Sequence, residues 1–126
     1  MARLACKVFG VIFVAIGLVV IVRGGQVDPN HNLLHVATGV AALYFGFVGS
    51  VSAAKRFCQT FGLFYLALGV LGMVLGDPAM NRAWQVGPVS LELADHGFHI
   101  VLGLIFLTSG LLTRSRAPRA RVAAFG

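Results

Sequence analysis

The sequence is poor in charged residues and in cysteine, and both shortages limit what kind of protein it can be. Only 11% of the 126 residues are charged and 58% are hydrophobic, whereas soluble proteins carry about a quarter charged residues. This composition excludes an ordinary soluble domain and predicts a membrane protein. The two cysteines, Cys6 and Cys58, form no paired-cysteine motif. We therefore expect two reduced thiols and no disulfide framework.

Familiar catalytic patterns are also missing from the chain. There is no glycine-rich phosphate loop with its lysine. A nucleophile needs a base within hydrogen-bond reach, but Ser109 and Cys58 are predicted far from every histidine. Four short helices without a charge at mid-depth also offer no obvious path for a transported ion. We therefore expect a protein that is not an enzyme.

Four long apolar runs account for most of the chain. They cover residues 8–22, 33–54, 57–76 and 97–113. Each is close to the roughly 20 residues that an α-helix needs to cross a bilayer. Because the bilayer core offers backbone groups no water, we predict an all-α membrane protein with four transmembrane helices. It forms one domain over residues 1–126, with a basic tail at 114–126.

Polar residues between the runs predict where the helices begin and end. We expect Asn30 or Asn32 to cap the second helix and Asp95 to cap the fourth. The Asp-Pro pairs at residues 28–29 and 77–78 are expected to stop the preceding helices and open loops. The alternating residues 89–93 suit a short interfacial segment over the bundle.

The charges are distributed unevenly along the chain, whose formal net charge is +6. Most basic residues precede the first run, separate the second from the third, or follow the fourth: Arg3, Lys7, Lys55, Arg56, Arg114, Arg116, Arg119 and Arg121. All four acids lie in the other two loops: Asp28, Asp77, Glu92 and Asp95. This predicts a multi-pass inner-membrane protein with both termini and the middle loop on the cytoplasmic side. The basic tail then binds anionic lipid, and no nucleic-acid partner is needed.

The chain also repeats itself. Residues 9–17 resemble residues 61–69 at an offset of 52, and the second and fourth helices match at an offset of 64. The second match is a shared pattern of one histidine and two glycines: His35, Gly39 and Gly46, then His99, Gly103 and Gly110. We predict two repeated helical hairpins, residues 1–54 and 55–113, related by an axis along the membrane normal.

Each predicted helix carries two glycines seven residues apart. A glycine inside a helix costs roughly 1 kcal/mol relative to alanine in water, so a repeated spacing indicates a packing role. Small residues let helices approach closely in lipid, and a seven-residue repeat favours left-handed crossings. We predict an antiparallel left-handed four-helix bundle, with Gly39, Gly46, Gly103 and Gly110 in its helix contacts.

All four histidines are predicted on the same outer side as the acids: His31, His35, His96 and His99. Spacings of three and four residues can place neighbouring members on one helix face. We favour a structural role, in which each histidine hydrogen-bonds a loop carbonyl or a cap of the opposite hairpin. Asn32 belongs to the same structural set.

Two alternative interpretations assign a cofactor to these histidines. His35 and His99 could be axial ligands of a b-type haem in an electron-transfer subunit. A Zn²⁺ or Cu²⁺ site could instead use three or four members of one set: His31, His35, Asp95, His96 and His99. The lipid bilayer is the expected partner of the chain. A homo-oligomer or a larger membrane complex is the further partner that we consider for a haem or metal protein.

The starts of the second and fourth helices also resemble a known family. The pattern Asn-x-x-His-x-x-x-Gly at 32–39 and Asp-x-x-x-His-x-x-x-Gly at 95–103 is similar to that of small bacterial four-helix membrane proteins of unknown function. The resemblance covers nearly the whole chain apart from the basic tail. It implies the four-helix fold and the importance of Asn32, His35, Asp95 and His99, without an activity. His31 and His96 depart from the pattern and leave open whether a metal site was gained.

Overall fold

The computed structural model describes residues 1–24 and 28–115. They form four α-helices, α1 (Ala2–Arg23), α2 (Pro29–Phe47), α3 (Val51–Leu75) and α4 (Leu93–Leu112), a short 3₁₀ helix (Pro78–Met80), and the strands β1 (Trp84–Val86) and β2 (Val89–Leu91). The fold is therefore mostly helical, with a small β-hairpin that we did not predict. Arg116, Arg119 and Arg121 of the predicted basic tail lie outside the described residues.

Three of the helices, α1, α3 and α4, are long and apolar enough to cross a membrane. They indicate a membrane protein. The helix α2 has 19 residues but begins with Pro-Asn-His-Asn, which lowers its hydropathy. The predicted fourth membrane crossing and the left-handed bundle therefore stay predictions.

Several predicted helix ends are wrong. The helix α1 begins at Ala2 rather than near residue 8. The second apolar run does not continue to residue 54, because α2 ends at Phe47 and a new helix begins at Val51. The side chain of Ser50 caps that helix by accepting a hydrogen bond from the Ala53 backbone N–H at 3.1 Å. A polar cap inside an apolar run therefore separates α2 from α3.

The predicted caps of α2 and α4 are also wrong. Asp28 caps α2 by accepting a hydrogen bond from the Asn30 N–H at 2.9 Å, and Pro29 opens this helix instead of stopping the previous one. Proline suits the first helical position because no hydrogen bond is lost there. Glu92 caps α4, and Asp95 completes a capping box by accepting from the Glu92 N–H at 2.8 Å.

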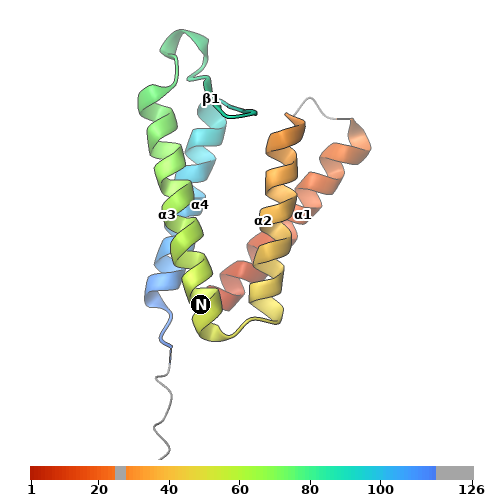
Figure 1. Cartoon of the computed structure of the whole chain (residues 1–126), viewed down its shortest axis with the longest axis vertical. Coiled ribbons are helices and arrows are strands. Elements are labelled where there is room, and N and C mark those ends of the chain that lie inside the picture. Colours follow the sequence, from red (N-terminus) through yellow and green to blue (C-terminus); the bar gives the residue numbers. More distant parts are fainter. Residues whose placement is uncertain (25–27, 116–126) are drawn as a thin grey trace, which may run out of the picture.

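The helices form two hairpins that lie side by side (Figure 1). The helix α1 packs along α2, and α3 packs along α4. The hairpins meet at the end where α1 and α3 begin, and they diverge toward the β-hairpin. At the meeting end the sulfurs of Cys6 and Cys58, both free and buried, lie 3.5 Å apart. The Ala2 N–H also donates a hydrogen bond to Thr113 Oγ1 at 2.8 Å.

Glycines lie where the two helices of each hairpin touch. A Cβ on Gly10 would lie 3.0 Å from the carbonyl oxygen of Gly39. In the other hairpin, a Cβ on Gly62 would lie 2.9 Å from the carbonyl oxygen of Gly103. Gly10 corresponds to Gly62 at the offset of 52, and Gly39 corresponds to Gly103 at the offset of 64. The two contacts support the predicted duplication, since the same close approach occurs at equivalent residues in both hairpins.

Candidate functional site

Three histidines meet at the diverging end of the hairpins. His31 and His35 lie one turn apart near the start of α2, and His99 lies near the start of α4. Each offers one ring nitrogen to a group whose nitrogens all lie within 4.8 Å of one another. The ring centroids are 4.4 Å apart for His31 and His35, and 6.2 Å apart for His35 and His99. Because residues four apart share a helix face, α2 supplies two members of this histidine cluster.

The cluster is shielded from solvent and short of hydrogen bonds. Only 6% of His31 and 2% of His99 is exposed. His31 Nε2, His35 Nε2 and His99 Nδ1 have no hydrogen-bond partner among the described residues. A buried polar group without a partner costs about 1–3 kcal/mol. Each histidine of the cluster therefore has one buried ring nitrogen that is available to a ligand.

Aromatic rings hold two of the histidines in place. The ring of Phe13 stacks on His35 with centroids 5.2 Å apart, and Tyr65 packs on His99 at 5.3 Å. The Tyr65 hydroxyl donates to Thr38 Oγ1 at 3.1 Å, so its own polar group is satisfied. Sequence reasoning missed both aromatic residues. The signal was present, because Phe13 and Tyr65 are equivalent at the same offset of 52 that relates the repeats.

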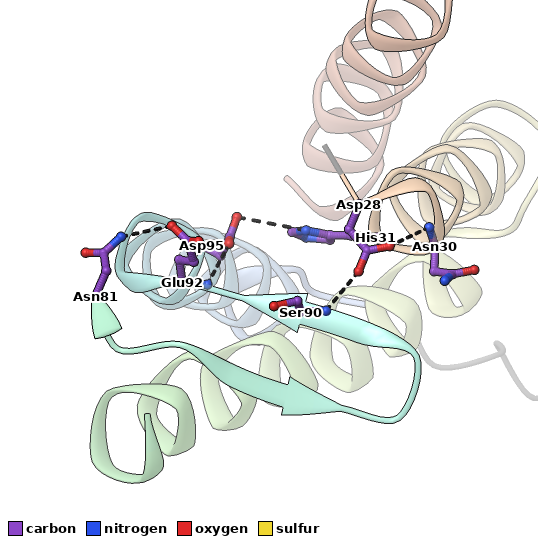
Figure 2. A network of polar contacts seen from close by, with 7 residues as sticks. All are labelled: Asp28, Asn30, His31, Asn81, Ser90, Glu92 and Asp95. Atoms are coloured by element: carbon purple, nitrogen blue, oxygen red, sulfur yellow. Dashed lines mark hydrogen bonds and ion pairs between the residues drawn. The ribbon is translucent and has the colours of Figure 1, made fainter. Parts of the chain in front are cut away.

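A carboxylate lies behind His31. Figure 2 shows His31 reaching from α2 toward Asp95 on α4, and His31 Nδ1 is 4.0 Å from Asp95 Oδ1. The second Asp95 oxygen accepts the hydrogen bond of the Glu92 N–H, which holds the carboxylate in place. His31 and Asp95 are equivalent at the offset of 64. A carboxylate behind an imidazole is the usual arrangement that orients a histidine ligand of a metal.

The β-hairpin is tied to the start of α2 by polar contacts of Asp28 and Asn30 (Figure 2). Asp28 Oδ2 accepts a hydrogen bond from the Ser90 N–H at 2.9 Å, and Asn30 Nδ2 donates to the Pro88 carbonyl at 3.3 Å. The hydrogen bond from Ser90, and then the one from Asn30, holds the pKa of the exposed Asp28 carboxyl below its ordinary value. The two hairpins are thereby joined at their diverging end as well.

Two predicted site residues do not join the cluster. His96 Nε2 lies 2.8 Å from the carbonyl oxygen of Arg82, and its ring packs against Gly72 within its own hairpin. Asn32 Nδ2 donates to the carbonyl oxygen of Gly17 at 3.2 Å. Asn32 and His96 correspond at the offset of 64. Asn32 connects α2 to α1, and His96 packs α4 against α3. The predicted five-residue ligand set thus divides into three histidines, one carboxylate behind them, and His96 apart.

A cavity opens beside the cluster. Its volume is about 590 Å³, and it lies between α2 and α3 beneath β2. All three histidines of the cluster are among its lining residues, and most other lining side chains are apolar. This volume falls within the range of about 300–1,000 Å³ that is usual for small-molecule sites.

Comparisons with known proteins give a family but no activity. No curated protein and no solved structure matches the chain. A family described as a domain of unknown function (DUF4383) matches residues 22–112, which include α2, α3, α4 and all four histidines. By this match, the chain belongs to the DUF4383 family of unknown function.

Proposed function

We propose that the chain is a metal-binding membrane protein that holds one divalent transition ion, Zn²⁺ or Cu²⁺, through His31, His35 and His99. The observation that carries this proposal is a cluster of three histidines that can each bring a ring nitrogen within 4.8 Å of the others. Each of the three also has one buried ring nitrogen without a hydrogen-bond partner among the described residues. Neutral imidazole is a preferred ligand of both ions. Asp95 is a positioning residue that orients His31 from behind.

The geometry requires a small contraction on binding. Zinc–nitrogen bonds of about 2.0–2.1 Å in a tetrahedral site separate the ligand nitrogens by about 3.4 Å. The cluster nitrogens lie within 4.8 Å of one another, so they need to approach by about an ångström. Three protein ligands leave the fourth position of the ion open, as in sites that bind a further molecule.

The metal accounts for more observations than either other interpretation. A structural role predicts hydrogen bonds from these histidines, and His96 makes one, but His35 and His99 make none among the described residues. A haem held between His35 and His99 meets a steric obstacle. The ring of His31 lies 4.4 Å from one and 5.8 Å from the other, in the space that the macrocycle needs.

The setting we propose is the bacterial cytoplasmic membrane, with four crossings and two duplicated hairpins. The acids and the histidine cluster lie at the β-hairpin end, whereas Arg3, Lys7 and Lys55 lie where α1 and α3 begin. Basic residues remain on the cytoplasmic side, which places the metal site on the outer side. The equivalent glycine contacts of the two hairpins support the duplication.

Metal binding can be measured directly on purified protein in detergent. After treatment with a chelator, equilibrium dialysis against Zn²⁺, and separately Cu²⁺, followed by elemental analysis should find one ion per chain. Occupancy at a hundred times the dissociation constant stabilises the fold by about 2.7 kcal/mol, so the melting temperature should also rise. His35→Gln and His99→Gln should each abolish both effects, because the amide replaces a ligand nitrogen.

The matched control is His96→Gln, which changes the same residue type outside the cluster and should retain one ion. Circular dichroism of each variant shows whether its helices are intact. Equal metal content in wild type, His35→Gln and His99→Gln overturns the site. A Soret band in protein expressed with added haem, lost in the same two variants, would favour the haem alternative instead.

A further inference from the structure

In the cavity beside the histidine cluster, the polar side chains other than the histidines have hydrogen-bond partners. Of the hydroxyl groups that line it, Tyr65 donates to Thr38. The remaining polar atoms without partners are the three nitrogens of the histidine cluster, at one end. The other lining residues include Leu34, Phe64 and Leu68, which are apolar. The cavity therefore suits a molecule with an apolar body and one small polar end.

The length of the cavity matches half a bilayer. Its lining runs along α2 from His31 to Ala41, ten residue-to-residue steps that span about 15 Å at 1.5 Å each. The hydrocarbon core of a bilayer is about 30 Å thick, so this is the depth of one leaflet. The histidines lie at the β-hairpin end, and Ala41 and Phe61 lie toward the meeting end of the hairpins. A lipid of the outer leaflet has the same orientation, with its head outward and its chain inward.

The β-hairpin covers the outer end of the cavity. Val89 is 7% exposed and Leu91 is 2% exposed, and both line the cavity. Asp28 and Asn30 hold this cover onto α2. The side between α2 and α3 is more open, since Leu34 is 53% exposed and Phe64 58% exposed. A ligand therefore enters sideways from the lipid and reaches the histidine cluster beneath the cover.

From these features we infer that the cavity binds one long-chain fatty acid, with its carboxylate at the histidine cluster and its chain running toward Ala41 and Phe61. This inference rests on the proposed metal site, because the carboxylate takes the open fourth position of the ion. A carboxylate is a suitable oxygen ligand for Zn²⁺. The acyl chain exchanges contact with lipid for contact with apolar side chains, so it contributes little to selectivity. The interaction of the head group therefore determines which lipid the cavity binds.

The test uses a photoreactive hexadecanoate that carries a diazirine at its terminal carbon. Zinc-loaded full-length protein is incubated with the probe in phosphatidylglycerol vesicles, irradiated, and mapped by peptide mass spectrometry. We expect labelling near Ala41 and Phe61 that excess hexadecanoate displaces and methyl hexadecanoate does not. Removal of zinc with a chelator should lower this displaceable labelling about tenfold, equivalent to about 1.4 kcal/mol of binding free energy.

Variants separate the cavity from the metal. Ala41→Phe fills the inner end of the cavity and should lower displaceable labelling about tenfold, while the protein still binds one zinc ion. The matched control is Ala67→Phe, the same change at an exposed position of α3 outside the cavity lining, which should change neither value. Unchanged labelling in Ala41→Phe overturns the fatty-acid site.

The outcomes distinguish the two proposals. Zinc bound at one ion per chain, with labelling that hexadecanoate does not displace, overturns the fatty-acid site alone. Displaceable labelling in a protein that binds no zinc overturns the metal site and the carboxylate–metal contact. Solvent extraction of the purified protein gives a further check, because a stoichiometric phospholipid in place of a fatty acid also overturns the inference.

Discussion

At the scale of single residues, the four histidines have two different roles. His96 has a carbonyl partner in its own hairpin, whereas the His35 and His99 rings have only aromatic neighbours and each other. A buried ring nitrogen without a hydrogen bond destabilises a fold unless something binds it. His96 Nδ1 also lacks a partner, but it packs against Gly72, and His96 is not in the group whose nitrogens come within 4.8 Å. We therefore assign structure to His96 and ligand binding to the cluster.

Asp95 gives the first prediction at this scale. Asp95→Asn should weaken zinc binding by about 10- to 100-fold, the usual effect of removing a carboxylate behind a histidine ligand. The amide still accepts the hydrogen bond of the Glu92 N–H, so α4 should keep its start and its helicity. The affinity is measured by competition with a chelator of known strength. Unchanged affinity would mean that Asp95 acts only as the capping-box partner of Glu92.

Asp28 predicts a pH dependence of stability. Its pKa in the folded protein is lower than its model-peptide value of 3.8, so the folded state favours the ionised carboxylate. The unfolded chain then binds more protons in acid, and the contribution of Asp28 to stability is present above pH 3.8 and is lost as the pH falls through the lower folded value. Thermal unfolding of wild type and Asp28→Asn should differ at neutral pH and converge in strong acid. A difference that is constant with pH would contradict this assignment.

At the scale of helices and strands, the sequence predicts which elements exist better than where they end. Apolar runs are a local signal, and each run covers most of one helix of the structure, although the second also crosses into α3. Helix ends depend on which of several neighbouring polar residues captures a free N–H. Near α4 both Glu92 and Asp95 can cap, and the structure uses Glu92 as the cap and Asp95 as its partner. For α2, Asp28 takes the role that we gave to Asn30 or Asn32.

The β-hairpin was only partly predictable. The alternation at Val89-Ser90-Leu91 was visible, and the structure buries the first and third of these residues. The partner strand required the Gly-Pro pair to be recognised as a two-residue turn. Gly87 has a φ of 57°, which the first central position of such a turn needs, and Pro88 follows it. The turn chemistry was therefore in the sequence, but the apolar pattern alone did not show the pairing.

The glycine contacts give a prediction about the packing of α3 on α4. A Cβ on Gly103 would lie 2.8 Å from the carbonyl oxygen of Gly62 and would also meet the backbone nitrogen of Leu66. Backbone cannot move aside as a side-chain end can, so Gly103→Ala should destabilise the protein by about 1–3 kcal/mol. The matched control is Gly97→Ala on the same helix, where no atom lies within 4 Å. That change should be neutral or stabilising by up to about 1 kcal/mol, since alanine favours the helix.

Unfolding of these two variants in a graded series of sodium dodecyl sulfate measures the difference. The comparison is internal, because both changes add one methyl group to α4. Equal stability of Gly103→Ala and wild type would show that α3 and α4 are farther apart than described. A similar result at Gly39, the equivalent residue of the first hairpin, would remove the support for duplication that the glycine contacts provide.

At the scale of the whole molecule, the predicted repeat accounts for a site that is nearly symmetric but whose ligands are not. The offsets pair His35 with His99 and Phe13 with Tyr65, and these residues do meet. The same offset pairs His31 with Asp95, one imidazole and one carboxylate, so the third ligand comes from one half only. The sequence showed the equivalences. It could not show which side chains face the opposite hairpin, because that depends on how each helix is rotated about its axis.

The cysteines give a prediction that tests how the hairpins meet. Cys6 Sγ and Cys58 Sγ lie 3.5 Å apart between α1 and α3, and a disulfide of about 2.05 Å needs only a modest approach. Diamide should therefore oxidise the two thiols to one disulfide within a single chain and be reduced to the hydrazine. Tryptic digestion without reductant should then yield residues 4–7 joined to residues 57–82. The link joins the hairpins at their meeting end, so it should also raise the melting temperature. Cys58→Ser gives no such peptide, and a wild-type protein that forms links only between chains would refute this packing of the two hairpins.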